Sequence, residues 1–263
     1  MYQTTYHRPT SVDEAVKLAS EDAKFISGGQ TLIPTMKQRL AAPSDLIDLT
    51  HIAGLNGITV NGSTVTIAAA TCHFDVANSE ALKAVCPGLA DLASHIGDPA
   101  VRHKGTIGGS IANNDPAADY PAGLLALDAT IVTSTRELAA SDFFTGLFET
   151  ALDENEIVTE VRFDAPDKAA YSKFPNPASR YAMAGVFVAK GSNGVRVAVA
   201  GAGNDGVYRD GDMEAALGGN FSAAALDDVS VDASNMMSDM HASAEYRAAL
   251  VKTMAKRAVQ QFA

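Results

Sequence analysis

The chain has 263 residues, of which 47% are hydrophobic, and it carries a net charge of −11 at pH 7. This length suits two or three small domains. An acidic chain without a concentrated basic patch repels a phosphate backbone, so nucleic acid is excluded as a partner. No apolar run reaches the roughly 18 residues of a membrane-spanning helix, so we expect no membrane span.

The two cysteines, Cys72 and Cys86, are too few for a disulfide scaffold or for a four-cysteine metal or iron–sulfur site. The first residues of the chain lack the basic and apolar regions of a secretory signal. Both observations favour a reducing, cytoplasmic location.

Residues 1–50 are predicted to form a small βαβ unit. A capping box, Ser11 with Glu14, opens a helix over about 11–20. A short strand at 24–26 runs into Ser-Gly-Gly, and a second helix follows over about 31–40, with a proline in its first turn. Residues 45–49 are the next strand.

The pattern changes from about residue 51. An Asn-Gly pair at 61–62 predicts a β-hairpin over 58–67. Short helices are expected at 75–78, 80–85 and 88–95, then a glycine-rich turn at 105–114, a helix at 118–127, and strands at 129–134 and 156–163. We expect this second part to cover 51–165 and to form one cofactor-binding unit with residues 1–50.

A boundary is predicted at 165–167, before a C-terminal part at 168–263. Strands at 171–174, 185–189 and 195–200 indicate an antiparallel sheet, and helices are expected at 213–217 and 243–262, the latter with an amphipathic face. The fold class is therefore α+β, with three parts.

The first glycine cluster, at residues 26–32, ends a strand and opens a helix. Gly28 and Gly29 let the backbone turn tightly and approach a ligand, and the free N–H groups of a helix start suit a pyrophosphate. Ser27 and Thr31 add hydroxyl donors. An ordinary strand-to-helix turn explains this segment equally well when it is taken alone.

The second cluster, at residues 105–120, combines glycines with small polar side chains and two carboxylates. Thr106, Ser110, Asn113 and Asn114 can bind phosphate or sugar hydroxyls, and Asp119 can accept from a ribityl or ribose hydroxyl. For Asp115 we favour a capping role at the following helix. Two such loops about eighty residues apart suggest one long dinucleotide bridged by two subdomains, either FAD or another nucleotide.

These motifs resemble a known family. Ser-Gly-Gly-Gln-Thr-Leu-Ile-Pro-Thr-Met-Lys at 27–37 is similar to the first FAD motif of the medium, flavoprotein subunits of the xanthine dehydrogenase and aerobic carbon monoxide dehydrogenase family of molybdenum hydroxylases. Thr-Ile-Gly-Gly at 106–109, continuing to Asp119, resembles the second FAD motif. The likeness extends to 154–163 and 173–182, so it covers nearly the whole chain.

The resemblance implies a two-subdomain FAD-binding module of the vanillyl-alcohol oxidase type, followed by a small C-terminal α+β domain. It assigns the pyrophosphate to Phe25, Ile26, Ser27, Gly28, Gly29, Gln30, Thr31 and Leu32. It assigns the phosphate and ribityl regions to the second motif, through Thr106, Ile107, Gly108, Gly109, Asn113 and Asp119. It places Ile96 and Val158 in apolar contact with flavin or adenine, and Lys173 and Tyr181 near the isoalloxazine.

The resemblance also implies the partners. FAD is expected to bind non-covalently and to pass electrons to an external acceptor. A large subunit carries the molybdenum cofactor, and a small subunit carries two 2Fe–2S clusters, in a dimer of heterotrimers. Gln30 stands where carbon monoxide dehydrogenases often have histidine, which weakens carbon monoxide as the substrate.

Three alternatives remain from the residues. One is a stand-alone FAD oxidoreductase with its own substrate, and another is a non-redox nucleotide-binding module. A nicotinamide dehydrogenase rests only on the G-x-G-x-x-G match at 201–206, where turn formers replace the required helix, so we predict a turn leaving a sheet. Cys72 and His73 are interpreted as structural, because neighbours on a strand point to opposite faces and no third ligand is recognisable.

Overall fold

The N-terminal segment forms a three-stranded parallel sheet in a computed structural model that describes residues 1–262. Its strands are β1 (Thr5–His7), β3 (Asp45–Asp48) and β2 (Lys24–Ile26), in that spatial order, with helices α1 (Val12–Leu18) and α2 (Leu32–Lys37). The capping box is confirmed, because the Ser11 hydroxyl accepts from the Glu14 N–H. Strand β1 was not predicted, since its three residues show no alternation.

Helix α2 ends three residues earlier than predicted. Arg39 adopts a positive φ of 63°, and the Leu40 N–H donates to the Thr35 carbonyl at 3.0 Å. This left-handed closure satisfies a carbonyl at the end of the helix and reverses the chain toward β3.

The middle segment holds a five-stranded antiparallel sheet and most of the helices. The sheet order is β4 (Ile58–Asn61), β5 (Thr64–Ala68), β10 (Val158–Asp164), β6 (Thr130–Thr133) and β7 (Glu137–Ala139). The helices are α3 (His73–Asn78), α4 (Glu80–Val85), α5 (Pro87–Ser94), α6 (Pro99–Arg102), α7 (Ile107–Asn113), α8 (Tyr120–Ala126) and α9 (Ala140–Phe143). A small hairpin, β8 (Phe144–Gly146) and β9 (Glu149–Thr150), follows α9.

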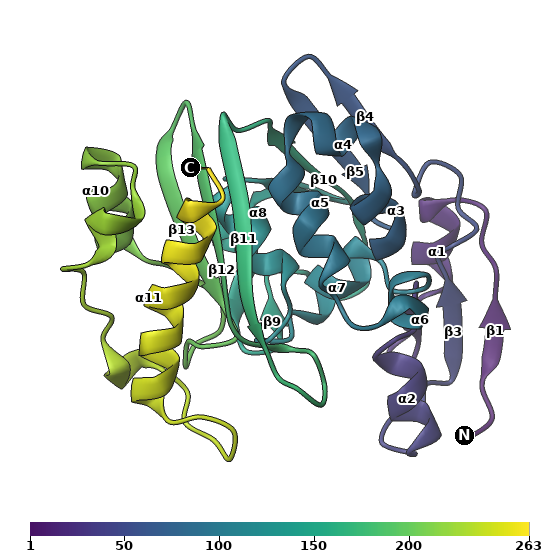
Figure 1. The fold of residues 1–263 in the computed structure, drawn as a ribbon. Helices are drawn as coiled ribbons and strands as arrows, with labels where there is room; N and C mark the ends of the chain where they lie inside the picture. The colour runs from purple at the N-terminus through teal and green to yellow at the C-terminus, as the bar shows by residue number, and fades with distance from the viewer. Residues whose placement is uncertain (263) are drawn as a thin grey trace.

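The C-terminal segment is an antiparallel sheet, as predicted, with helices against it (Figure 1). Its order is β11 (Lys168–Pro175), β12 (Ala182–Gly191), β13 (Gly194–Ala200) and β14 (Tyr208–Arg209). Helices α10 (Gly211–Gly219) and α11 (Ala244–Gln260) and two 3₁₀ turns, η1 (Ala223–Leu226) and η2 (Ala233–Asn235), complete the chain. The glycine pattern at 201–206 leads into β14 and not into a helix, which confirms the predicted turn.

Strand β12 explains how this sheet joins the rest of the molecule. Val186 and Val188 pack into the core beneath α10 and α11, while Phe187 and Ala189 pack into the core of the middle segment with α5 and α8. Because both faces are covered, the strand is a nearly continuous apolar run instead of an alternating one. In Figure 1 the sheet stands between α11 on one side and α5 and α8 on the other.

Within residues 1–262, no helix is both long enough and apolar enough to cross a membrane.

Candidate functional site

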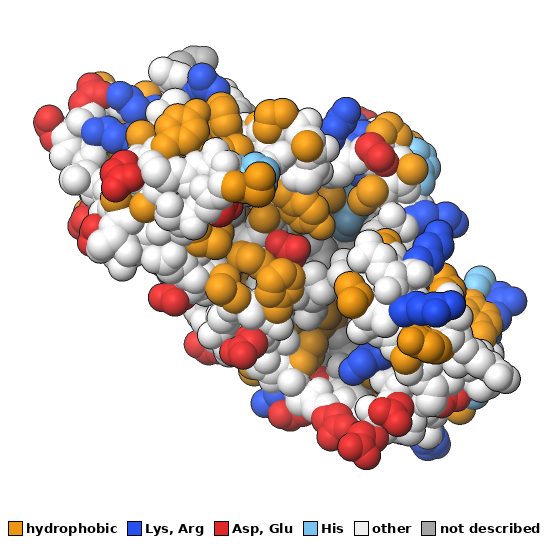
Figure 2. Space-filling view, turned by 90° about the horizontal axis from the view of Figure 1, so that it is seen from below, with side chains coloured by type: hydrophobic (Ala, Val, Ile, Leu, Met, Phe, Trp, Pro, Cys, Tyr) orange, Lys and Arg blue, Asp and Glu red, His pale blue; other side chains and the backbone are white. Residues whose placement is uncertain are grey.

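A cleft of about 720 Å³ is lined by segments from all three parts of the chain. It opens on the lower face of the molecule, where lysine and arginine side chains gather on the N-terminal side (Figure 2). The residues that the family resemblance assigned to FAD all line this cleft except Ile107, and of the other polar candidates in the second cluster Ser110 lines it and Asn114 does not. The fold thus brings together positions up to about 150 residues apart in the sequence.

The loop between β2 and α2 forms one wall and presents unpaired backbone donors. The N–H groups of residues 27–31 make no hydrogen bond within the described chain, and Gly29 has a φ of 67° that favours glycine. Such a row of free amides is costly unless an acceptor binds them. It has the chemistry of an anion site, with the start of α2 adding a partial positive charge.

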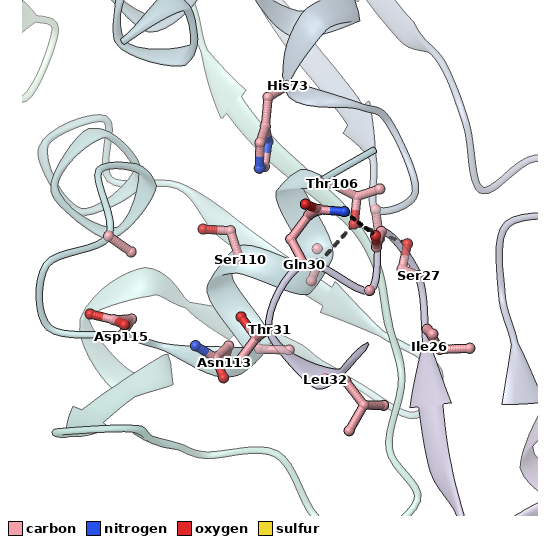
Figure 3. A pocket seen from close by; sticks show the side chains of 18 of the residues that line it. Ile26, Ser27, Gln30, Thr31, Leu32, His73, Thr106, Ser110, Asn113 and Asp115 are labelled. Atoms are coloured by element: carbon pink, nitrogen blue, oxygen red, sulfur yellow. Dashed lines mark hydrogen bonds between the residues drawn. The ribbon is translucent and has the colours of Figure 1, made fainter. Parts of the chain in front are cut away.

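Gly28 has a different reason to be glycine from the one that the sequence suggested. A Cβ at this position would stand 2.2 Å from the carbonyl oxygen of Lys104 and 2.6 Å from the Cα of Gly105. The first loop therefore lies directly against the second, backbone on backbone. The Thr106 hydroxyl donates to the Ser27 hydroxyl at 2.9 Å and joins the two loops again (Figure 3).

The second motif is a helix, where the sequence predicted a glycine turn. Thr106 caps α7 by accepting from the Gly109 N–H, while the N–H groups of Ile107 and Gly108 donate to the carbonyls of Thr71 and Ala69 at 3.1 and 2.8 Å. These amides are therefore occupied within the chain. The Ile107 side chain lies in the core, fully buried, and is not among the residues that line the cleft.

Polar residues in this helix and at its C-terminal end divide between the cleft and the scaffold. Ser110 and Asn113 line the cavity and are drawn beside it in Figure 3. Asn114 does not: it is buried at a φ of 41°, and its amide donates to the carbonyls of Gly146 and Glu149 at 2.9 and 2.7 Å. Asn114 therefore anchors the β8–β9 hairpin.

The predicted capping role of Asp115 is wrong. Helix α8 begins after Asp119, whereas the Asp115 carboxylate accepts from the nearby Ala117 N–H at 2.9 Å and borders the cleft.

Asp119 and Lys173 form a buried ion pair in the cleft wall. The Lys173 ammonium lies 2.9 Å from one carboxylate oxygen, and the Tyr171 hydroxyl donates to the other at 2.5 Å. Lys173 also donates to the His95 carbonyl at 3.1 Å. Burial raises the pKa of Asp119, and the Lys173 charge acts against that rise. Neither charge therefore stands alone near a ligand.

Two further residues line the cleft: Glu156, which the sequence did not single out, and His73, which the sequence pattern indicated to be structural. Glu156 is buried and accepts from Arg136, Thr133 and Thr135; burial opposes its ionisation, but these donors lower its pKa to about 2. His73 begins α3, with Cys72 as its N-cap, so the two residues do not alternate along a strand. The signal for Glu156 was its place just before an apolar strand, whereas no pattern around His73 marked it as a site residue.

Apolar side chains complete the cleft. Ile96 and Val158 lie in its wall with Ile157 and Leu55, and Tyr181, nearly half exposed, stands at its edge. A polar row of amides beside an apolar surface matches a ligand that has a pyrophosphate and an aromatic ring system, as FAD does.

Comparison with known proteins identifies which dinucleotide this type of chain binds. Residues 2–166 match the family described as the FAD binding domain in molybdopterin dehydrogenase. The chain belongs to this family. It is 36% identical to the carbon monoxide dehydrogenase medium chain of Hydrogenophaga pseudoflava and 35% identical to the nicotine 6-hydroxylase medium subunit of Paenarthrobacter nicotinovorans, each over 97% of this chain and 95% of the relative.

Solved structures agree with the family assignment. Carbon monoxide dehydrogenase from Hydrogenophaga pseudoflava contains a chain that superposes with a TM-score of 0.88 at 37% identity, covering 98% of this chain and 96% of that one. The fold expected for the family's FAD-binding subunit is thereby confirmed, and FAD is the cofactor. The chain is an oxidoreductase subunit with an electron-transfer role.

Proposed function

We propose that the cleft holds one FAD non-covalently and that the chain passes electrons from the iron–sulfur clusters of a partner subunit, through this FAD, to an external acceptor. The observation that supports the binding mode is the row of N–H groups at residues 27–31, which belong to a cleft-lining loop and have no partner in the described chain. The pyrophosphate is the part of FAD that these amides fit.

The remaining cleft residues follow from that placement. Gln30 holds the loop by donating to the Gly28 carbonyl at 3.0 Å, and Thr106, Gly109 and Asn113 face the phosphate and ribityl parts from α7. Asp119 holds Lys173 in place at the far wall and can still accept from a ribityl hydroxyl. Ile96, Val158 and Tyr181 supply surface for the ring systems. Ile107 positions α7 from the core without touching the cofactor.

When bound, FAD supplies the redox chemistry, which no protein side chain here replaces. The protein binds and orients the cofactor and excludes water from its apolar wall. The Lys173 ammonium is compensated by Asp119 2.9 Å away, so its attraction for negative charge on the cofactor is smaller than a lone buried lysine would exert. We therefore expect the Asp119–Lys173 pair to position the isoalloxazine ring of FAD and to have little effect on the reduction potential of the flavin.

The assembly completes the proposal. Relatives named as medium chains and medium subunits, together with solved multi-subunit carbon monoxide dehydrogenases, support a large and a small partner subunit. We propose that the large partner carries the molybdenum cofactor and selects the substrate, that the small one carries two 2Fe–2S clusters, and that the whole is a cytoplasmic dimer of heterotrimers. Within the chain we propose parts at 1–50, 51–165 and 168–263.

The test is to co-express the chain with the genes beside its own and to record the absorption spectrum of the purified complex. We expect flavin bands, one acid-releasable FAD per chain, and molybdenum and iron in the same complex. A colourless complex, or a persistent monomer, contradicts the proposal. Turnover of a small alcohol or acid by the isolated chain would instead support a stand-alone oxidoreductase.

A further inference from the structure

His73 has unused hydrogen-bonding capacity at the edge of the FAD cleft. The residue is 4% exposed, and its Nδ1 is buried without a hydrogen-bond partner among the described residues. A neutral imidazole carries one donor and one acceptor nitrogen, and a buried polar group is normally paired. The imidazole is thus incomplete in the protein alone.

The ring is fixed in place by the second loop. The backbone N–H of His73 donates to the Gly105 carbonyl at 2.9 Å, and a Cβ at position 105 would stand 2.6 Å from the ring nitrogen Nε2 of His73. Gly105 is therefore small because the imidazole lies over it. Figure 3 shows the imidazole pointing from the start of α3 into the cavity, with a ring nitrogen at its tip.

The charge state of the ring suits a hydrogen bond better than an ion pair. Burial lowers the pKa of His73 to about 4, and the nearby positive charge of Arg102 adds to this effect. At pH 7 the imidazole is therefore neutral, and it can donate through one nitrogen only. A neutral donor of this kind binds an oxygen or nitrogen acceptor of a ligand when the hydrogen-bond geometry is right, and the strength of the bond depends little on the charge of the ligand.

We propose that His73 is a further FAD-binding residue, whose neutral imidazole donates its one N–H to an acceptor atom of the bound cofactor where the two loops meet. The proposal rests on FAD occupying this cleft. The competing role is internal: the Tyr120 ring lies 5.3 Å from the imidazole, and its hydroxyl is also buried without a partner. The Tyr120 hydroxyl is therefore the internal candidate for a hydrogen bond with the imidazole.

The test compares FAD affinities in the co-expressed complex, after FAD has been removed with a chaotropic salt and titrated back by flavin fluorescence. His73→Leu should raise the dissociation constant on the order of tenfold, the effect of one lost hydrogen bond. His73→Gln, which keeps a donor, should stay within about threefold. Thermal unfolding of the FAD-free complex should not fall in His73→Leu, because the unpaired ring is removed.

Tyr120→Phe is the matched control and should leave FAD affinity unchanged. Wild-type affinity in His73→Leu, or an equal loss in Tyr120→Phe, overturns the assignment. If His73→Leu does not fold, His73→Asn serves instead: it is polar but too short to reach the cofactor, so a tenfold loss is again expected and wild-type affinity overturns it. Failure of the wild-type complex to rebind FAD would count against the FAD site itself and is thus distinguishable.

Discussion

Replacing Gly28 by alanine tests the contact between the two loops. The added Cβ would stand 2.2 Å from the Lys104 carbonyl oxygen, while ordinary contacts begin at 3.4 Å, so the loops must separate by about 1 Å. Both neighbours are backbone atoms, which cannot rotate away as a side chain can. Overpacking of this kind costs about 1–3 kcal/mol.

That cost should appear in both FAD affinity and stability. If the overpacking energy destabilises only the FAD-bound state, the FAD dissociation constant of Gly28→Ala rises by a factor of about 5–150. If the overpacking energy instead destabilises the folded chain, the melting temperature drops by about 2–4 °C for each kcal/mol in a chain of this size. We would measure both, by flavin fluorescence titration and by differential scanning calorimetry, on the same preparations.

Gly218→Ala is the matched control for this experiment. Nothing lies within 4 Å of a Cβ at position 218, which is near the end of α10 and outside the cleft. The added methyl group should leave FAD affinity unchanged and stabilise the helix by up to about 1 kcal/mol. A Gly28→Ala chain with wild-type affinity and melting temperature would refute the argument from loop contact.

Two further predictions concern buried charges. Asp119→Asn should lower the free energy of unfolding by about 3–5 kcal/mol in urea titrations, because it leaves Lys173 buried without its partner; Asp119→Asn combined with Lys173→Met should recover much of the loss, and no loss in the single variant would contradict the pair. Glu156 has a folded pKa of about 2, below its ordinary 4.5. Its ionisation therefore stabilises the fold by about 3 kcal/mol above pH 4.5, and this is lost as the pH falls toward 2. Melting curves of wild type and Glu156→Gln should differ at pH 7 and converge near pH 2, and a constant difference would contradict this.

The parts of the fold that the sequence predicted correctly are those with local signals. The capping box at Ser11 and the antiparallel C-terminal sheet need only neighbouring residues to be recognised. Strand β1 had no such signal. Its three residues become a strand because β3 offers them a parallel partner, with Tyr6 beside Leu46, and that pairing is a tertiary event.

The second motif shows why glycine alone is ambiguous. The sequence predicts a turn at Gly108 and Gly109, because adjacent glycines let the backbone turn tightly. In the structure neither has a positive φ, and both lie in α7. Gly108 is needed for close packing instead, since a Cβ there would stand 2.5 Å from the Ala69 Cβ. A glycine in the sequence is compatible with either a positive φ or close packing, and only the residue packed against it in the structure shows which of the two applies.

Cys72 and His73 show how one local error can hide a candidate site residue. The local sequence pattern predicts a strand here, where the two side chains would point to opposite faces, and therefore a structural role for both residues. Cysteine is not one of the preferred helix N-cap residues, so nothing marked a helix start at this position. The helix begins there because the Cys72 backbone pairs with Thr106 and the His73 N–H bonds Gly105, both on the second loop. The contact that starts α3 is therefore also the contact that turns the imidazole into the cleft, and no pattern within α3 itself could have predicted it.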